Sequence, residues 1–200
     1  MKATASECRD KALTQSSGQI VALPTAPPAR VITRGAFHTA LSQFATIIAG
    51  EKRSAFWRSA PGNERRWVEN PERTAQNLLF VFLRAKFGDQ ALVLEEIAAG
   101  AGRLDQLVVC EGGFRAVLEL KMLGSPGYSL TYALAGEEQI LHYMDSRGVR
   151  VGFLVVFDGR EAHGTGIQAV TVAGGNTIFT VFVDVRSTWK KRARSGTADG

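Results

Sequence analysis

Residues 104–122, LDQLVVCEGGFRAVLELKM, predict two β-strands joined by a tight turn. Segments 104–110 and 115–122 are both apolar and rich in Val and Leu, which is typical of buried strands. Between them, Gly112 and Gly113 supply the positive φ angles that a tight turn needs. The stretch therefore predicts a hairpin.

Three charged residues interrupt these apolar strands. Asp105 lies near the start of the first strand, and Glu119 and Lys121 lie two residues apart in the second. Because side chains alternate between the two faces of a strand, Glu119 and Lys121 point to one side. Their neighbours Leu118 and Leu120 point to the other side. Pairing of the two strands would bring Asp105 near Glu119.

These residue types predict a metal-dependent site that cleaves phosphodiester bonds. Mg²⁺ takes oxygen ligands, often one or two carboxylates together with water and substrate phosphate. Asp105 and Glu119 supply carboxylates, and the backbone carbonyl of Leu120 lies within reach as a further ligand. A bound metal lowers the pKa of its water and offsets charge on the phosphate. Lys121 can orient that water or stabilise the transition state as a point charge.

An alternative interpretation needs no site at all. Glu119 and Lys121 would form an ion pair on an exposed strand face, and Asp105 would be a turn residue after Gly102 and Arg103. However, charged side chains inside an apolar strand are costly to bury unless they are paired or bind a metal. This cost favours the site over the surface ion pair.

Three short motifs follow one another along the chain. They are Glu96 leading to Gly102-Arg103-Leu104-Asp105, then Glu119-Leu120-Lys121, then Gln139 leading to Tyr143. Over residues 68–160 this order resembles the PD-(D/E)xK nuclease superfamily. The Gln-x-x-x-Tyr element is similar to that of RecB-like nuclease domains. The first motif also resembles nuclease domains associated with AAA-type ATPases.

The resemblance implies roles for particular residues of this chain. Asp105 and Glu119 would bind Mg²⁺ or Mn²⁺, and Lys121 would be the catalytic lysine. Gln139 and Tyr143 would flank the site from the following helix. In that helix, predicted over residues 130–147 and closed by Gly148, these two side chains lie four apart and so share a face. Alternatively, they are boundary residues with polar tips in water.

The family pattern also includes an acid on the helix before the core sheet. Glu72 matches it best, and Glu96 is a weaker candidate for a metal ligand. Asn70 as N-cap, Pro71 at the first position and Gly88 at the end predict a helix here. Its apolar face consists of Ala75, Leu78, Leu79, Phe82 and Leu83. Glu72 lies at the end of this face, with Gln76 as a companion, or it merely complements the helix dipole.

The remaining pattern predicts the fold class. An apolar run at 149–157 predicts a buried strand, and segments 168–173 and 177–185 predict two more around a glycine turn. A helix, three strands, a helix and a strand form an α/β core with a mixed sheet flanked by helices. This order is the restriction-endonuclease-like αβββαβ core that the resemblance implies.

The chain divides into four predicted parts. Residues 1–30 form a flexible polar tail, and residues 31–67 form a helical, basic and aromatic extension. The nuclease-like domain covers residues 68–186, and a basic tail covers 187–200. Within the extension, arginines alternate with tryptophans. They would either contact nucleic acid or anchor a solvated face.

Composition points to an intracellular nucleic-acid partner. The net charge is +5, which suits binding to the phosphates of a nucleic acid. For the metal-dependent nuclease, DNA is expected rather than RNA. Cys8 and Cys110 offer no disulfide framework, and neither a signal peptide nor a membrane span is evident, so the cytoplasm is expected. A homodimer or a partner ATPase or sensor chain would complete the assembly. The alternative function is an inactive nucleic-acid-binding or assembly module on the same fold.

Overall fold

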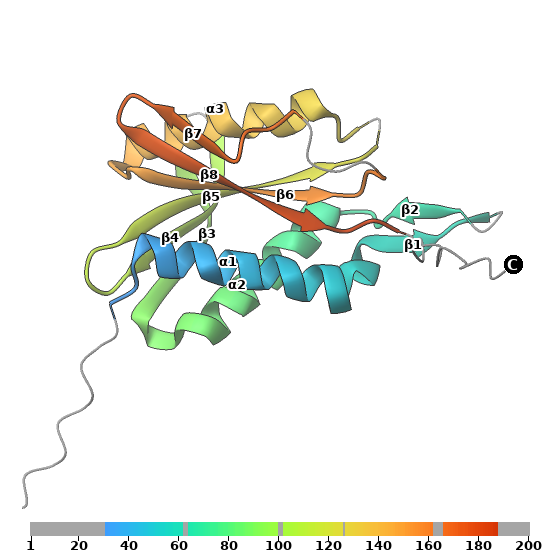
Figure 1. Cartoon of the computed structure of the whole chain (residues 1–200), viewed down its shortest axis with the longest axis horizontal. Coiled ribbons are helices and arrows are strands. Elements are labelled where there is room, and N and C mark those ends of the chain that lie inside the picture. Colours follow the sequence, from blue (N-terminus) through green and yellow to red (C-terminus); the bar gives the residue numbers. More distant parts are fainter. Residues whose placement is uncertain (1–30, 62–63, 100–101, 126, 162–165, 188–200) are drawn as a thin grey trace, which may run out of the picture.

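The computed structural model describes residues 31–61, 64–99, 102–125, 127–161 and 166–187, with the backbone alone at 96–99, 102 and 103 (Figure 1). The predicted tail 1–30, and all but the first residue of the predicted tail 187–200, lie outside these residues. None of the described helices is both long and apolar enough to span a membrane.

A six-stranded mixed sheet forms the centre of the molecule, in the order β3-β4-β5-β6-β8-β7. Strands β5, β6 and β8 run parallel to one another, and the other neighbours are antiparallel. The strands are β3 (Ala91–Ala99), β4 (Gly102–Cys110), β5 (Arg115–Leu123), β6 (Val151–Asp158), β7 (Val170–Ala173) and β8 (Asn176–Asp184). The predicted hairpin is β4–β5.

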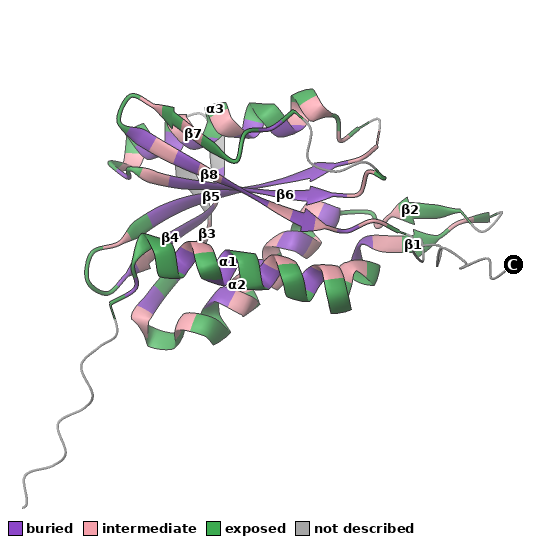
Figure 2. Ribbon diagram, viewed as in Figure 1, coloured by how far each residue is buried: buried purple, intermediate pink, exposed green. Residues whose placement is uncertain are grey.

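Three helices cover the two faces of this sheet. Helices α1 (Arg34–Ile47) and α2 (Pro71–Phe87) lie on one face, and α3 (Leu130–Arg147) lies on the other (Figure 1). Burial follows this layering, since buried residues follow the strands while the outer sides of the helices are exposed (Figure 2). The predicted α/β class with a mixed sheet flanked by helices, and its αβββαβ order from α2 to β6, are confirmed.

Local sequence signals explain where α2 begins and ends. The Asn70 side chain accepts a hydrogen bond from the Arg73 backbone N–H at 3.1 Å, and Pro71 occupies the first turn. At the other end, Gly88 has a φ of 54°, a conformation that glycine adopts without a steric penalty. This start is important for the site because it sets the position of Glu72 in the first turn.

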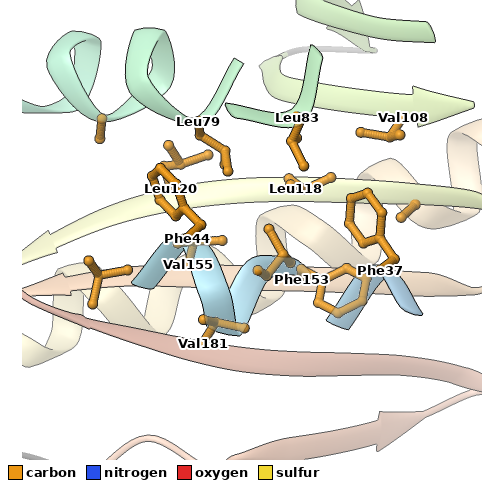
Figure 3. Close-up of a cluster of buried hydrophobic side chains, with 14 of the residues drawn as sticks. Phe37, Phe44, Leu79, Leu83, Val108, Leu118, Leu120, Phe153, Val155 and Val181 are labelled. Carbon is orange, nitrogen blue, oxygen red and sulfur yellow. The ribbon is translucent and has the colours of Figure 1, made fainter. Parts of the chain in front are cut away.

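The core between the sheet and helices α1 and α2 fixes which way β5 faces. Figure 3 shows Phe44 and Leu79 from the two helices lying over Leu118 and Leu120 of β5. Burying side chains of this size stabilises the fold by roughly 1.5–3 kcal/mol each. With Leu118 and Leu120 held there, the alternation of the strand turns Glu119 and Lys121 to the opposite face, as predicted. This face is the one that α3 covers.

A short two-stranded ribbon lies beyond the end of the main sheet (Figure 1). It consists of β1 (Trp57–Ser59) and β2 (Arg65–Trp67), and it follows α1 through a π-helical turn, η1 (Ile48–Lys52), and a 3-10 turn, η2 (Arg53–Phe56). The Trp57 indole N–H donates to the Val185 carbonyl at 2.5 Å, which ties the ribbon to the end of β8.

Candidate active site

Asp105 lies where the ladder between β4 and β5 ends. The last registered pair joins Gln106 to Leu118. Just beyond it, the Leu120 backbone N–H donates to Asp105 Oδ2 at 2.8 Å, and Gln76 Nε2 from α2 donates to Asp105 Oδ1 at 2.7 Å. The carboxylate is therefore held from both sides. A carboxylate oxygen has two lone-pair positions, so each oxygen keeps one for a further partner.

Glu119 and Lys121 form an ion pair, with Lys121 Nζ 2.8 Å from Glu119 Oε1. The Glu119 residue is 3% exposed and Lys121 is 6% exposed. The alternative interpretation expected an ion pair on an exposed face, and the structure has the pair but buries it beneath α3. The second oxygen, Glu119 Oε2, is buried and has no hydrogen-bond partner among the described residues.

Burial raises the pKa of both acids, and the charge of Asp105 raises that of Glu119 further. Burial raises the pKa of Glu119 to about 7, with a further rise from the Asp105 charge and a partial offset from Lys121. Burial also raises the pKa of Asp105, against the lowering effects of the Leu120 N–H, Lys121 and Gln76. The two carboxylates therefore share a site that favours an additional positive charge.

Glu72 joins this group from the first turn of α2. Its carboxylate accepts a hydrogen bond from the Tyr132 hydroxyl at the start of α3. Its negative charge adds to the rise in the pKa of both Asp105 and Glu119, which places it near the two acids. Glu72 and Asp105 are half-buried, so the group opens to solvent on this side.

Tyr132 is a component that the sequence did not single out. Lys121 Nζ lies 4.9 Å from the centre of its ring, within the range of a cation–π contact. Burial and the hydrogen bond to Glu72 both raise the pKa of its hydroxyl. A signal was present in the sequence, because Tyr132 shares a helical stripe with Gly136, Ile140 and Tyr143.

Gly136 explains how α3 approaches the site so closely. A Cβ atom at this position would lie 3.0 Å from Lys121 Cγ and 2.7 Å from Leu154 Cδ1. Because glycine has no side chain, the helix can lie directly on the aliphatic stem of Lys121. The lysine is thus confined between the sheet and α3.

The two residues expected to flank the site from α3 behave differently. Tyr143 is buried, and the charges of Glu119 and Asp105 contribute to the rise in its pKa after burial itself. Gln139 is exposed. Residues four apart on a helix differ by only roughly 40° around the axis, so the two still share a side of α3. The exposure of Gln139 fits the alternative of a boundary residue with its polar tip in water, while a role for Gln139 at the site stays a prediction.

For two further predicted metal ligands, the Glu96 carboxylate and the Leu120 carbonyl, metal binding stays a prediction. Glu96 lies on β3, where its side chain is outside the described part of the structure. At Leu120 the backbone N–H is bound to Asp105, while a role for its carbonyl as a ligand stays a prediction.

The donor set fits a hard divalent cation. In the described part of the chain, no group of three or more His, Cys, Asp and Glu residues is arranged to hold a metal ion. Mg²⁺ does not require such a cage, because one or two carboxylates with water and substrate often suffice. Asp105 and Glu119 offer two carboxylates, and Glu119 Oε2 accepts no hydrogen bond from any residue that the structure describes. Mg²⁺ or Mn²⁺ would be held there.

Comparison with known proteins gives only partial alignments. No protein-family model and no curated protein matches the chain. Three solved structures align with about half of it: the EndoMS–dsDNA2 complex (25% identity, TM-score 0.29), a repair endonuclease from Pyrococcus abyssi (21%, 0.29) and Pyrococcus furiosus SfsA in complex with Ca²⁺ (16%, 0.30). The matches cover 48%, 48% and 51% of this chain and 39%, 40% and 53% of those chains.

The raised pKa of Glu119 predicts a pH-dependent loss of stability in the metal-free protein. Between pH 4.5, its ordinary pKa, and about 7, folded Glu119 keeps a proton that the unfolded chain has lost. Stability is therefore greatest below this window and falls as pH rises through it. In urea unfolding with EDTA present, the free energy of unfolding of wild type should fall by ~2 kcal/mol relative to that of Glu119→Gln as the pH rises from 4.5 to 7.5. A difference that does not change with pH would contradict this assignment.

Proposed function

We propose that this chain is a metal-dependent nuclease that hydrolyses phosphodiester bonds in DNA. One observation carries the proposal: the buried carboxylate of Glu119 lies 2.8 Å from the Lys121 ammonium, and the charge of Asp105 on the neighbouring strand raises the pKa of Glu119. Acids with shifted pKa values that cluster with a cation and are open to solvent on one side are typical of catalytic sites. The net charge of +5 supports a polyanionic substrate.

Each residue has a defined part in this proposal. Asp105 and Glu119 would hold Mg²⁺ or Mn²⁺, which when bound activates water and offsets phosphate charge. Gln76 and the Leu120 N–H orient the Asp105 carboxylate. Lys121 would position the attacking water or stabilise negative charge on the phosphate. Glu72 orients Tyr132, whose ring lies against the Lys121 ammonium.

A non-catalytic nucleic-acid-binding module on the same fold is the second candidate. The observation in its favour is that Lys121 and Glu119 already neutralise each other across 2.8 Å, which is what a purely structural pair would do. Under that function, DNA binding would be insensitive to EDTA, and no substrate would be cleaved. The two candidates therefore differ in whether the protein cleaves DNA when a divalent metal is present.

Cleavage of plasmid and single-stranded DNA distinguishes them. Wild type should cleave with Mg²⁺ or Mn²⁺ and lose cleavage in EDTA. Lys121→Met keeps the aliphatic stem that packs under α3 and removes the charge. Measured per folded molecule, with the folded fraction taken from circular dichroism at the assay temperature, its cleavage rate should fall by roughly 10²–10³-fold, as when one electrostatic donor is removed from an active site.

Lys86→Met is the matched control, since Lys86 is an exposed lysine in the last turn of α2. It should cleave at the wild-type rate. Equal rates for Lys121→Met and wild type would remove Lys121 from the catalytic site. No cleavage by wild type with either metal would favour the binding module.

A further inference from the structure

A hollow of about 540 Å³ lies between the β1–β2 ribbon and the segment that follows β5. It is outside the acid–lysine group described above. Its lining includes three exposed arginines and three half-buried aromatic side chains: Arg58, Arg65, Arg66, Trp57, Trp67 and Tyr128. One acid, Glu69, also lines it, so the lining carries more positive than negative charge.

The ribbon brings these groups together in registered pairs. Trp57 lies opposite Trp67 with ring centres 4.3 Å apart, and Arg58 lies opposite Arg66. Like charges directly opposite one another in a two-stranded ribbon are destabilising. Arg66 Nη2 pairs with Glu64 Oε2 at 3.1 Å, which offsets part of this repulsion. A phosphate bound at the hollow would offset more of it, because the planar guanidinium of arginine matches the geometry of a phosphate group.

The aromatic rings lead from the hollow to the candidate active site. Trp67 contacts Tyr128 edge-on at 6.1 Å, and Tyr128 contacts Tyr132 at 5.7 Å. The Tyr132 ring lies 4.9 Å from Lys121 Nζ. An unbroken series of rings therefore connects the arginine-rich ribbon with the lysine of the proposed catalytic group.

We propose that the hollow binds an unpaired stretch of nucleic acid strand next to the phosphate that is cleaved. The proposal rests on the proposed nuclease function and adds to it the class of substrate, a single-stranded nucleic acid. Aromatic rings among cations are the usual platform for single strands, because unpaired bases stack on the rings while the cations follow the backbone. A paired duplex would offer phosphates to the arginines but no free base faces to the rings.

Binding can be measured without cleavage by the intrinsic fluorescence of Trp57 and Trp67. The Trp189→Phe background removes the remaining tryptophan of the chain. In EDTA, (dT)₁₂ should quench the emission of this protein. In the same background, Arg65→Ala/Arg66→Ala should bind (dT)₁₂ at least ~10-fold more weakly. The slope of log K against log salt should become shallower by about 1.4, for two lost contacts to a single strand.

Arg84→Ala/Arg115→Ala is the matched control, because it also removes two exposed arginines. Arg84 is in the last turn of α2, and Arg115 begins β5, so each lies at the opposite end of its element from the hollow. This variant should bind within roughly twofold of the background protein, since distant charges are screened. Equal weakening by both double variants would overturn the proposal.

Two more measurements separate stacking from simple attraction to charge. Tyr128→Ala should weaken (dT)₁₂ binding by roughly 5-fold or more while leaving the salt slope unchanged, as expected for a lost stacking contact. Binding of a 12-bp duplex should be less affected than binding of (dT)₁₂ by Tyr128→Ala, because a duplex offers no free base face to the ring. An equal effect on the duplex, or no effect of Tyr128→Ala, would overturn single-strand binding at the hollow.

The outcomes also distinguish this inference from the proposed function. If the protein never cleaves DNA but the hollow variants lose (dT)₁₂ binding as described, the hollow is a strand-binding site on a non-catalytic module. If wild type cleaves DNA and the hollow variants bind (dT)₁₂ normally, the nuclease function stands and the proposal for the hollow is wrong.

Discussion

Replacing Asp105 with Asn should abolish metal-dependent DNA cleavage, with a loss of at least ~10³-fold. The change removes one of two carboxylates from the proposed metal site, and a bound metal contributes several kcal/mol of charge stabilisation to such reactions. Asn has the same shape, its oxygen can still accept from the Leu120 N–H, and its NH₂ group can donate to Gln76 once the Gln76 amide turns its oxygen toward it. The fold should therefore survive, and a thermal melt should show it.

Asp89→Asn is the control for Asp105→Asn. Asp89 is an exposed acid after α2, so its replacement makes the same change in charge outside the site. It should cleave plasmid and single-stranded DNA at the wild-type rate with Mg²⁺ or Mn²⁺. If Asp105→Asn cleaved as fast as Asp89→Asn, Asp105 would have no part in catalysis.

Breaking the buried ion pair should cost much of the stability of the metal-free protein. Removing one partner leaves the other charge buried and unpaired, which costs ~3–5 kcal/mol, whereas replacing both by neutral groups of similar shape is often neutral. Lys121→Met should therefore be strongly destabilised at pH 8 in EDTA. Glu119→Gln/Lys121→Met should recover most of the loss, as measured by urea unfolding.

The single variant Glu119→Gln completes a double-mutant cycle. A coupling energy of about 2 kcal/mol or more is expected for this pair, because both side chains are nearly inaccessible to solvent. A coupling energy close to zero would be the value for an exposed pair and would show that α3 does not cover the site.

The sequence predicted those parts of the site that depend on local geometry. The turn glycines and the two apolar segments located β4 and β5, and the alternation along β5 placed Glu119 and Lys121 together on one face. The start of α2 followed from Asn70 and Pro71. Each of these features is decided within a few residues, and local patterns therefore suffice for them.

Contacts between distant elements were harder to predict. Gln76 was expected only as a companion of Glu72, but it crosses from α2 to hold Asp105. Tyr132 was not singled out, because its hydrogen bond to Glu72 joins the first turns of two helices that lie on opposite faces of the sheet, which no local pattern shows. The exposure of Gln139 depends on the rotation of α3 over the sheet, which a spacing of four residues leaves open.

Strand boundaries near turns also differ from those predicted. The segment 149–157 becomes β6 only at Val151, because the Val149 N–H still closes α3 by donating to the Met144 carbonyl at 2.9 Å. The predicted core included a strand before β4, but the sequence pattern assigned no residues to it; in the structure this strand is β3. The ribbon β1–β2 was not predicted, since strands of three residues are too short to show a period.

The most direct test of metal binding by Asp105 and Glu119 is a crystal structure of the protein soaked in Mn²⁺, in which the anomalous signal locates the ion. We predict a Mn²⁺ peak between the Asp105 and Glu119 carboxylates, with Glu119 Oε2 as a ligand and Lys121 Nζ separated from Glu119 Oε1 by more than the 2.8 Å of the metal-free pair. An intact Lys121–Glu119 pair with no Mn²⁺ peak at these carboxylates would contradict the metal-dependent site.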